Sequence, residues 1–314
     1  MGVMHIAQRD LIWVRVSKNS FKAGFRLRHI GTILHGKLHD EFGALVDRAQ
    51  VTIFTEARDV ERLLSQSRPA FDARDARVAD MTDESVDTFY SCTLCQSFAP
   101  NHVCIITPER LGLCGAYNWL DGQAAHEINP TGPNQPVRKG RAIDERRGEW
   151  EEVNKFVYAN SNRSIERFSA YSLMENPMTS CGCFEVIVAI VPECNGVIAV
   201  NREYQGDTPT GMRFSTLAGA VGGGAQTPGF VGVGRLYLSS KKFISAEGGL
   251  PRLVWMPREL KEAVGPRIEE RAREMGLEGF VEKIADETIA TESEGVLAHM
   301  ERVEHPALTL DPLI

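Results

Sequence analysis

The sequence predicts a mixed α+β fold in two parts, a small α/β unit over residues 1–84 and a larger α+β domain over residues 85–314. Segments with strand composition alternate with segments of helical periodicity along the chain. Residues 66–84 are polar, charged and interrupted by Pro69, which is typical of a linker. The length of 314 residues also favours two domains over one.

Two strands and two helices are predicted in the first unit. Residues 11–17 and 50–54 are rich in β-branched and aromatic side chains, as strands are. Apolar side chains recur at roughly helical spacing over residues 20–43, and a short helix is predicted over 56–64. The first unit is therefore expected to be a compact α/β unit.

The larger domain is predicted to contain both element types around one long loop. Its helices are expected at residues 149–158, 164–175, 257–275 and 289–303. Its strands are expected at residues 184–191, 197–200, 236–238 and 252–256. Residues 92–134 are rich in turn residues and predict a long ordered loop, which is usually functional.

Composition excludes several classes of protein. The chain is 43% hydrophobic and 25% charged, which is ordinary for a globular protein with a core. A net charge of −7 makes a polyanion a poor partner, so no nucleic acid is expected. No run of 18 apolar residues and no signal-peptide pattern is present, so we expect a cytoplasmic protein that does not enter a membrane. In such a reducing compartment, cysteines are expected in metal or catalytic sites rather than in disulfides.

Six of the seven cysteines fall in two short clusters. They are Cys92, Cys95, Cys104 and Cys114 in the first cluster, and Cys181 and Cys183 in the second. Four thiolates on one loop suit a tetrahedral zinc or an iron–sulfur cluster. Zinc sites usually show two close pairs, and only one is present here, so the spacing favours iron–sulfur. The seventh, Cys194, is expected to be a plain buried thiol.

The tripeptide Cys181-Gly182-Cys183 has the form of a chelate. Two thiolates and the two intervening amide nitrogens form an N2S2 donor set, and its square-planar geometry favours nickel or copper. Glycine leaves the plane uncrowded and tolerates the bend. The alternative is a turn that happens to carry two cysteines. The thiolates could also bridge to a further metal with an open coordination position.

A glycine-rich segment follows over residues 219–234. A phosphate-binding loop is one interpretation, but the segment lacks the Gly-Lys-Ser/Thr ending and the dinucleotide fingerprint. Close backbone packing, or a turn near the metal site, is therefore the favoured interpretation.

Three stretches carry a resemblance to a known family. They are Cys92-Thr-Leu-Cys95-Gln-Ser-Phe98 continuing through Cys104 and Cys114-Gly-Ala, then Asn129-Pro-Thr-Gly-Pro133, and Cys181-Gly-Cys183. Together they resemble acetyl-CoA synthase, the nickel–iron–sulfur subunit of the carbon monoxide dehydrogenase/acetyl-CoA synthase system. The resemblance extends over essentially the whole chain.

The resemblance implies a ligand for each metal. Cys92, Cys95, Cys104 and Cys114 are implied to hold a 4Fe–4S cluster. Cys95 is implied to bridge to a proximal nickel, which Cys181 and Cys183 also bind. A distal nickel is implied to take its N2S2 set from Cys181, Gly182 and Cys183. Phe98 is implied to lie beside the proximal metal and shape a small-ligand pocket; the alternative is an ordinary core aromatic.

The resemblance also implies an activity. The family is a CO-methylating acyltransferase that condenses a methyl group from a corrinoid iron–sulfur protein, CO and coenzyme A into acetyl-CoA. Coenzyme A is thus a substrate whose phosphates need cations. The candidates near in sequence are Arg110, Arg138, Lys139 and Arg141, with none singled out. The competing hypotheses are a non-enzymatic 4Fe–4S electron carrier and a zinc-stabilised interaction module.

The resemblance covers only the C-terminal portion of the family's bacterial members. Their large N-terminal domain docks carbon monoxide dehydrogenase, lines the CO tunnel and forms part of the cavity over the metals. No counterpart precedes Met1, so the sequence is interpreted as a truncated or minimal form. Docking of the dehydrogenase is accordingly a doubtful expectation for this chain.

Overall fold

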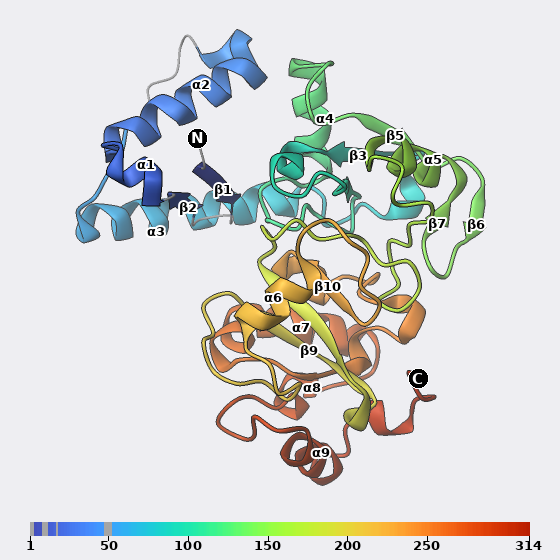
Figure 1. The fold of residues 1–314 in the computed structure, drawn as a ribbon. Helices are drawn as coiled ribbons and strands as arrows, with labels where there is room; N and C mark the ends of the chain where they lie inside the picture. Colours follow the sequence, from blue (N-terminus) through green and yellow to red (C-terminus); the bar gives the residue numbers. More distant parts are fainter. Residues whose placement is uncertain (1–2, 8–11, 17, 47–51) are drawn as a thin grey trace.

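The computed structural model describes residues 3–7, 12–16, 18–46 and 52–314. Its architecture is mixed α+β, as predicted, with an N-terminal group of helices and one hairpin beside a larger body (Figure 1). The N-terminal elements are β1 (Val3–Ala7), β2 (Ile12–Val16), α1 (Lys18–Lys22), α2 (Leu27–Val46) and α3 (Ala57–Ala76). β1 and β2 pair antiparallel, which confirms the predicted strand over residues 12–16. Residues 11 and 17 lie outside the described part of the chain.

Two predictions for this region are wrong. The helix expected over residues 20–43 is interrupted, because the chain turns at Gly24 (φ +93°) between α1 and α2. A glycine in this left-handed conformation commonly ends a helix. The strand expected over 50–54 is absent from residues 52–54, since the hairpin sheet consists of β1 and β2 alone; residues 50 and 51 lie outside the described part.

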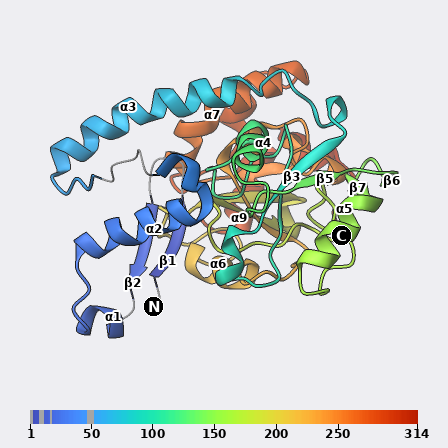
Figure 2. The same ribbon diagram turned by 90° about the horizontal axis from the view of Figure 1, so that it is seen from above.

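The linker predicted over residues 66–84 is also wrong, because α3 continues through Pro69 to Ala76. Most residues around Pro69 are good helix formers, so the helix survives the one backbone hydrogen bond that proline removes. The C-terminal end of α3 is fastened to the larger body. Asp72 forms an ion pair with Arg267 of α7 (Arg258–Glu274) at 3.7 Å, and the two helices lie side by side in Figure 2.

The larger body contains the remaining regular elements. Its helices are α4 (Trp119–Ile128), α5 (Glu151–Asn160), α6 (Phe214–Val221), α7 (Arg258–Glu274), α8 (Phe280–Lys283) and α9 (Ser293–Arg302). Its strands are β3 (Thr88–Cys92), β4 (Cys104–Ile106), β5 (Pro136–Arg138), β6 (Ala142–Asp144), β7 (Glu149–Trp150), β8 (Val186–Val191), β9 (Gly196–Asn201), β10 (Phe230–Val233) and β11 (Leu253–Trp255).

The centre of this body is a four-stranded sheet in the order β10-β8-β9-β11. β8 and β9 form a hairpin through Asn195, which adopts φ +46°, and β10 pairs antiparallel with β8. Every residue of β9 is buried, and β8 is almost entirely buried, so their continuous apolar runs are explained by burial on both faces. Among the described residues, no helix combines the length and apolar character needed to cross a membrane.

A second sheet, in the order β4-β3-β5, carries the first cysteine cluster. The long loop predicted over residues 92–134 is thus partly wrong, because it contains β4 and α4. Asn118 explains where α4 begins: its side chain accepts from the backbone N–H of Asp121, whose carboxylate accepts from Asn118 N–H in return.

Two further element predictions fail in this body. Residues 164–175 are irregular because distant groups bind their backbone: Asn154 accepts from Phe168 N–H and Glu247 accepts from Leu173 N–H. Residues 236–238 belong to a 3₁₀ helix, in which Tyr237 N–H donates to Gly234. In both cases tertiary contacts override the local sequence preference.

A buried histidine makes the stability of this body depend on pH. His305 is 1% exposed; its Nδ1 accepts from Ala307 N–H, and its Nε2 donates to the carbonyl of Leu253. Burial lowers the pKa of His305 to about 4. Below pH 6.5, His305 binds a proton in the unfolded chain but stays neutral in the folded chain. The free energy of unfolding therefore falls as the pH drops from 6.5 to about 4, by up to roughly 1.4 kcal/mol per pH unit.

We expect His305→Gln to flatten this dependence in denaturant unfolding measured between pH 7 and pH 4.5. His35→Gln, on an exposed position of α2, is the matched control and should leave the dependence unchanged. Parallel pH curves for His305→Gln and the wild type would contradict the assignment.

Candidate metal centre

The β3–β4 hairpin brings the first cysteines together. Cys92 and Cys104 are directly opposite each other in the antiparallel register, at the end of the hairpin. Cys95 lies in the 3₁₀ turn Leu94–Ser97 that follows β3, and its carbonyl accepts from the N–H groups of Phe98 and Ala99. The short connection therefore holds Cys95 next to the paired cysteines.

Cys114 reaches the same place from a tight turn. Gly115 N–H donates to Gly112 C=O (2.8 Å), and Gly112 N–H donates to Tyr117 C=O (2.8 Å). Gly115 has φ +70°, and a Cβ there would lie 2.8 Å from the carboxyl group of Glu185. Glycine is thus required by both the backbone conformation and the close approach.

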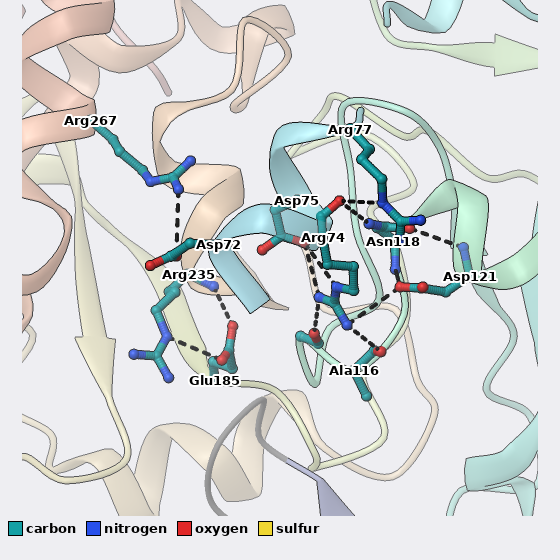
Figure 3. A network of polar contacts seen from close by, with 11 residues as sticks. Asp72, Arg74, Asp75, Arg77, Ala116, Asn118, Asp121, Glu185, Arg235 and Arg267 are labelled. Carbon is teal, nitrogen blue, oxygen red and sulfur yellow. Dashed lines mark hydrogen bonds and ion pairs between the residues drawn. The ribbon is translucent and has the colours of Figure 1, made fainter. Parts of the chain in front are cut away.

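Glu185 joins the two cysteine clusters. Its backbone N–H donates to Leu113 C=O (3.0 Å), beside Cys114, and it stands two residues after Cys183. Its side chain is 2% exposed and accepts from Arg235 Nε (3.1 Å) and from Arg235 N–H (2.8 Å). Figure 3 shows this pair near the end of α3, where Arg74 donates to the carbonyls of Gly115 and Ala116.

Cys181, Gly182 and Cys183 lie on the segment that enters β8. Two hydrogen bonds hold Ser180, the residue before them. Its carbonyl accepts from Gly224 N–H (2.9 Å), and its Oγ accepts from Gly232 N–H (2.8 Å). A Cβ on Gly224 would lie 3.0 Å from His102 N. Close backbone packing of the glycine-rich segment next to the cysteines is confirmed.

Three sulfur atoms from the two clusters meet. The Sγ atoms of Cys95, Cys181 and Cys183 all lie within 4.8 Å of one another, and Cys95 Sγ is 3.7 Å from Cys183 Sγ. The amide nitrogen of Cys183 lies 3.2 Å from Cys181 Sγ, so the tripeptide folds its nitrogen and sulfur toward each other. Gly182 adopts φ +103°, and apart from its two chain neighbours no described residue has an atom within 4 Å of where a Cβ would be. The turn is therefore open above the glycine, as a chelate requires.

Burial raises the pKa of three thiols in the first cluster, those of Cys92, Cys104 and Cys114. For Cys92 the rise is large, with the neighbouring Cys104, Cys114 and Cys95 adding to it. The pKa of Cys104 rises to about 11 and that of Cys114 to about 12, again mainly because of burial. Each thiol is near enough to the others to affect its ionisation. A bound metal would replace these protons, since metal-bound thiols are deprotonated.

The second cluster behaves differently. Hydrogen bonds with Cys181 and Cys95 lower the pKa of Cys183, while hydrogen bonds with Cys183 and Cys95 raise that of Cys181. Three soft sulfur donors this close together fit a thiophilic metal.

The other residues singled out in the sequence are Phe98, the candidate cations for phosphate and Cys194. Phe98 is half-buried directly after the Cys95 turn, and its role as a pocket residue stays a prediction. Among the candidate cations for phosphate, Arg110 is buried against Ala170 and Tyr237, and Lys139 donates to Asp83 C=O. Cys194 is confirmed as a buried thiol that donates to Ser293 C=O.

Sequence reasoning missed Glu185, Arg235 and Arg202. Arg202 follows β9 and donates from Nη2 to the carbonyl of Gly182 (2.7 Å). One signal was available for Glu185, since an acid at the start of an apolar strand requires a partner when it is buried. No pattern in the sequence links the two arginines to the cysteines, because the contacts depend on strand pairing.

Two family models match this chain. The model for the C-terminal part of the ACS/CODH beta subunit matches residues 71–314. The model described as CO dehydrogenase/acetyl-CoA synthase complex beta subunit matches residues 1–60.

Individual proteins match along nearly the whole chain. The carbon monoxide dehydrogenase/acetyl-CoA synthase subunit alpha of Moorella thermoacetica is 55% identical over 314 residues, which are 100% of this chain and 43% of that protein. The acetyl-CoA decarbonylase/synthase complex subunit beta of Methanopyrus kandleri is 45% identical over 98% of this chain and 64% of its own length. The chain thus spans less than two thirds of either relative.

One solved structure, of the C-terminal domain of the acetyl-coenzyme A synthase alpha subunit, is 54% identical. It covers 43% of this chain and 100% of its own, with a TM-score of 0.41.

Proposed function

This chain belongs to the family of ACS/CODH beta subunits, and from that premise we propose that it is the metal-bearing portion of an acetyl-CoA synthase. Its reaction would condense a methyl group, CO and coenzyme A into acetyl-CoA. The observation that carries the proposal is the meeting of Cys95, Cys181 and Cys183 within 4.8 Å, from two segments far apart in the chain.

The donor set fits the metals that this reaction needs. Cys92, Cys95, Cys104 and Cys114 would hold a 4Fe–4S cluster, and Cys95, Cys181 and Cys183 a proximal nickel. Cys181, Gly182 and Cys183 would hold a distal nickel through two sulfurs and two amide nitrogens. When bound, this group supplies a reducible, sulfur-rich site for carbon ligands.

The protein's own residues would bind, orient and shield that site. Cys181 and Cys183 are at most 9% exposed, and Ala99 packs against them fully buried, so water is largely excluded from the sulfurs. Phe98 would form part of the pocket wall for a ligand as small as CO. The hydrogen bond from Glu185 N–H to Leu113 C=O would fix the two cysteine segments relative to each other, and those of Ser180 would fix the second segment to the glycine-rich segment.

Partners follow from the family and the chemistry. The matched Moorella protein is a subunit of carbon monoxide dehydrogenase/acetyl-CoA synthase, so we propose the dehydrogenase as an assembly partner. A corrinoid iron–sulfur protein is proposed as methyl donor, with CO and coenzyme A as the other substrates.

Anaerobic metal loading followed by an activity assay tests the proposal. We expect about four iron and about two nickel atoms per chain, and acetyl-CoA from CO, a methylcobalamin-type donor and coenzyme A. Iron without nickel would instead indicate an electron carrier, and zinc alone a zinc-stabilised interaction module. Fully loaded, reduced protein that makes no acetyl-CoA would contradict catalytic competence of this portion.

A further inference from the structure

Arg202 lies against the chelating tripeptide because of strand pairing. Val186 of β8 is opposite Asn201 of β9, so the residue after β9 meets the segment before β8. The Arg202 guanidinium donates from Nη2 to the Gly182 carbonyl oxygen at 2.7 Å. This contact joins a cation to the backbone of the proposed nickel-binding tripeptide.

Two aromatic rings hold the guanidinium in that orientation. Its central carbon lies 5.9 Å from the ring centroid of Phe184 and 5.4 Å from that of Phe214. Both rings are buried, at 0% and 6% exposure, and their centroids are 6.1 Å apart. A cation within about 6 Å of an aromatic face is attracted to it, so the arginine is positioned before any metal binds.

The hydrogen-bonded oxygen belongs to a peptide unit that the proposed chelate uses. The Gly182 carbonyl and the Cys183 nitrogen share one planar, resonance-coupled amide. To serve as a nickel ligand, the Cys183 amide would have to release its proton to solvent water. The resulting negative charge would be shared with the Gly182 oxygen, which accepts the hydrogen bond from Arg202.

We propose that Arg202 is a positioning residue for nickel, whose guanidinium stabilises the charge that metal binding places on the Gly182 oxygen. The inference rests on the proposed function, because it requires a metal bound through the Cys183 amide. Hydrogen bonds between a charged donor and a charged acceptor are stronger than neutral ones. Partners of this kind typically contribute 10- to 100-fold to metal affinity.

The test compares nickel affinity at fixed pH in metal-loaded protein by competition with a chelator. Arg202→Met keeps the apolar stem against the two rings and removes the charge; Arg202→Lys keeps the charge. We expect nickel to dissociate about 10- to 100-fold more readily from Arg202→Met, with Arg202→Lys intermediate and the iron content unchanged. Weakening of the visible absorption of amide-bound nickel should follow the same order.

Arg258→Gln is the control. Arg258 is 64% exposed and forms an ion pair with Glu262, and its substitution changes the net charge by the same amount as Arg202→Met. Nickel affinity of Arg202→Met equal to wild type would overturn the proposal while leaving the proposed function intact. Wild-type protein that binds no nickel would overturn both. If Arg202→Met loses its iron or fails to fold, Arg202→Gln is tested in its place. A nickel affinity of Arg202→Gln equal to that of the wild type would likewise overturn the proposal.

Discussion

Cys183→Ser is expected to abolish nickel binding while leaving most of the iron in place. Cys183 contributes its sulfur and its amide nitrogen to the proposed nickel sites, and hydrogen bonds with Cys181 and Cys95 lower the pKa of its thiol. The four cysteines proposed for iron lie on a separate segment, in which the β3–β4 hairpin places Cys92 opposite Cys104. A serine oxygen is a poor ligand for a soft metal, so acetyl-CoA synthesis should fall below detection.

Anaerobic metal analysis of purified Cys183→Ser protein checks this result. Cys194→Ser is the matched control, because Cys194 is also buried but is hydrogen-bonded to Ser293, away from the other thiols. The control should keep both metals. Loss of the whole iron complement in Cys183→Ser would show that the two subsites depend on each other.

Arg235→Met should destabilise the protein by about 3 kcal/mol. The substitution leaves the carboxylate of Glu185, 2% exposed, without its side-chain cation. Breaking a buried pair in this way typically costs about 3–5 kcal/mol, and the 30% exposure of Arg235 favours the lower end. Because Glu185 joins the Cys114 turn to the segment after Cys183, iron should also be released faster to a chelator.

Denaturant unfolding of equally metal-loaded proteins measures the difference. Arg213→Met, which breaks the exposed ion pair with Asp207, should leave stability close to that of the wild type. The double variant Glu185→Leu/Arg235→Met should recover part of the loss, since no buried charge remains. Equal stability of Arg235→Met and Arg213→Met would mean that the buried carboxylate does not need its arginine.

The meeting of the two cysteine clusters was more predictable from the sequence than the fold around them. Cysteine spacing and the glycine between Cys181 and Cys183 are local features, and the structure brings Cys95 next to both as expected. The strands β8 and β9 were also predictable from a local feature. A strand buried on both faces consists of a continuous run of apolar residues, which is visible in the sequence.

The failures come where distant groups decide local conformation. Residues 164–175 have helical composition, but Asn154 and Glu247 take their backbone N–H groups. Pro69 suggested a linker, whereas the flanking helix formers and the anchored C-terminal end of α3 keep the helix continuous. Arg202 and Arg235 were missed because only the pairing of β8 with β9, and the position of the chain after β10, place them beside the cysteines.

The contact between Cys95 and Cys183 also has a consequence for how the protein assembles. These residues are 88 positions apart, so a metal bound to both closes a long loop of the unfolded chain. The entropic cost of such a closure grows only slowly with loop length, and pairing of the sheets in the folded chain would meet that cost without the metal. The four cysteines proposed for iron, by contrast, span one short segment, in which Cys92 and Cys104 lie opposite each other in the β3–β4 hairpin. Iron is therefore expected to enter early in folding, and nickel only after β8 has docked, which makes nickel uptake a measure of completed folding.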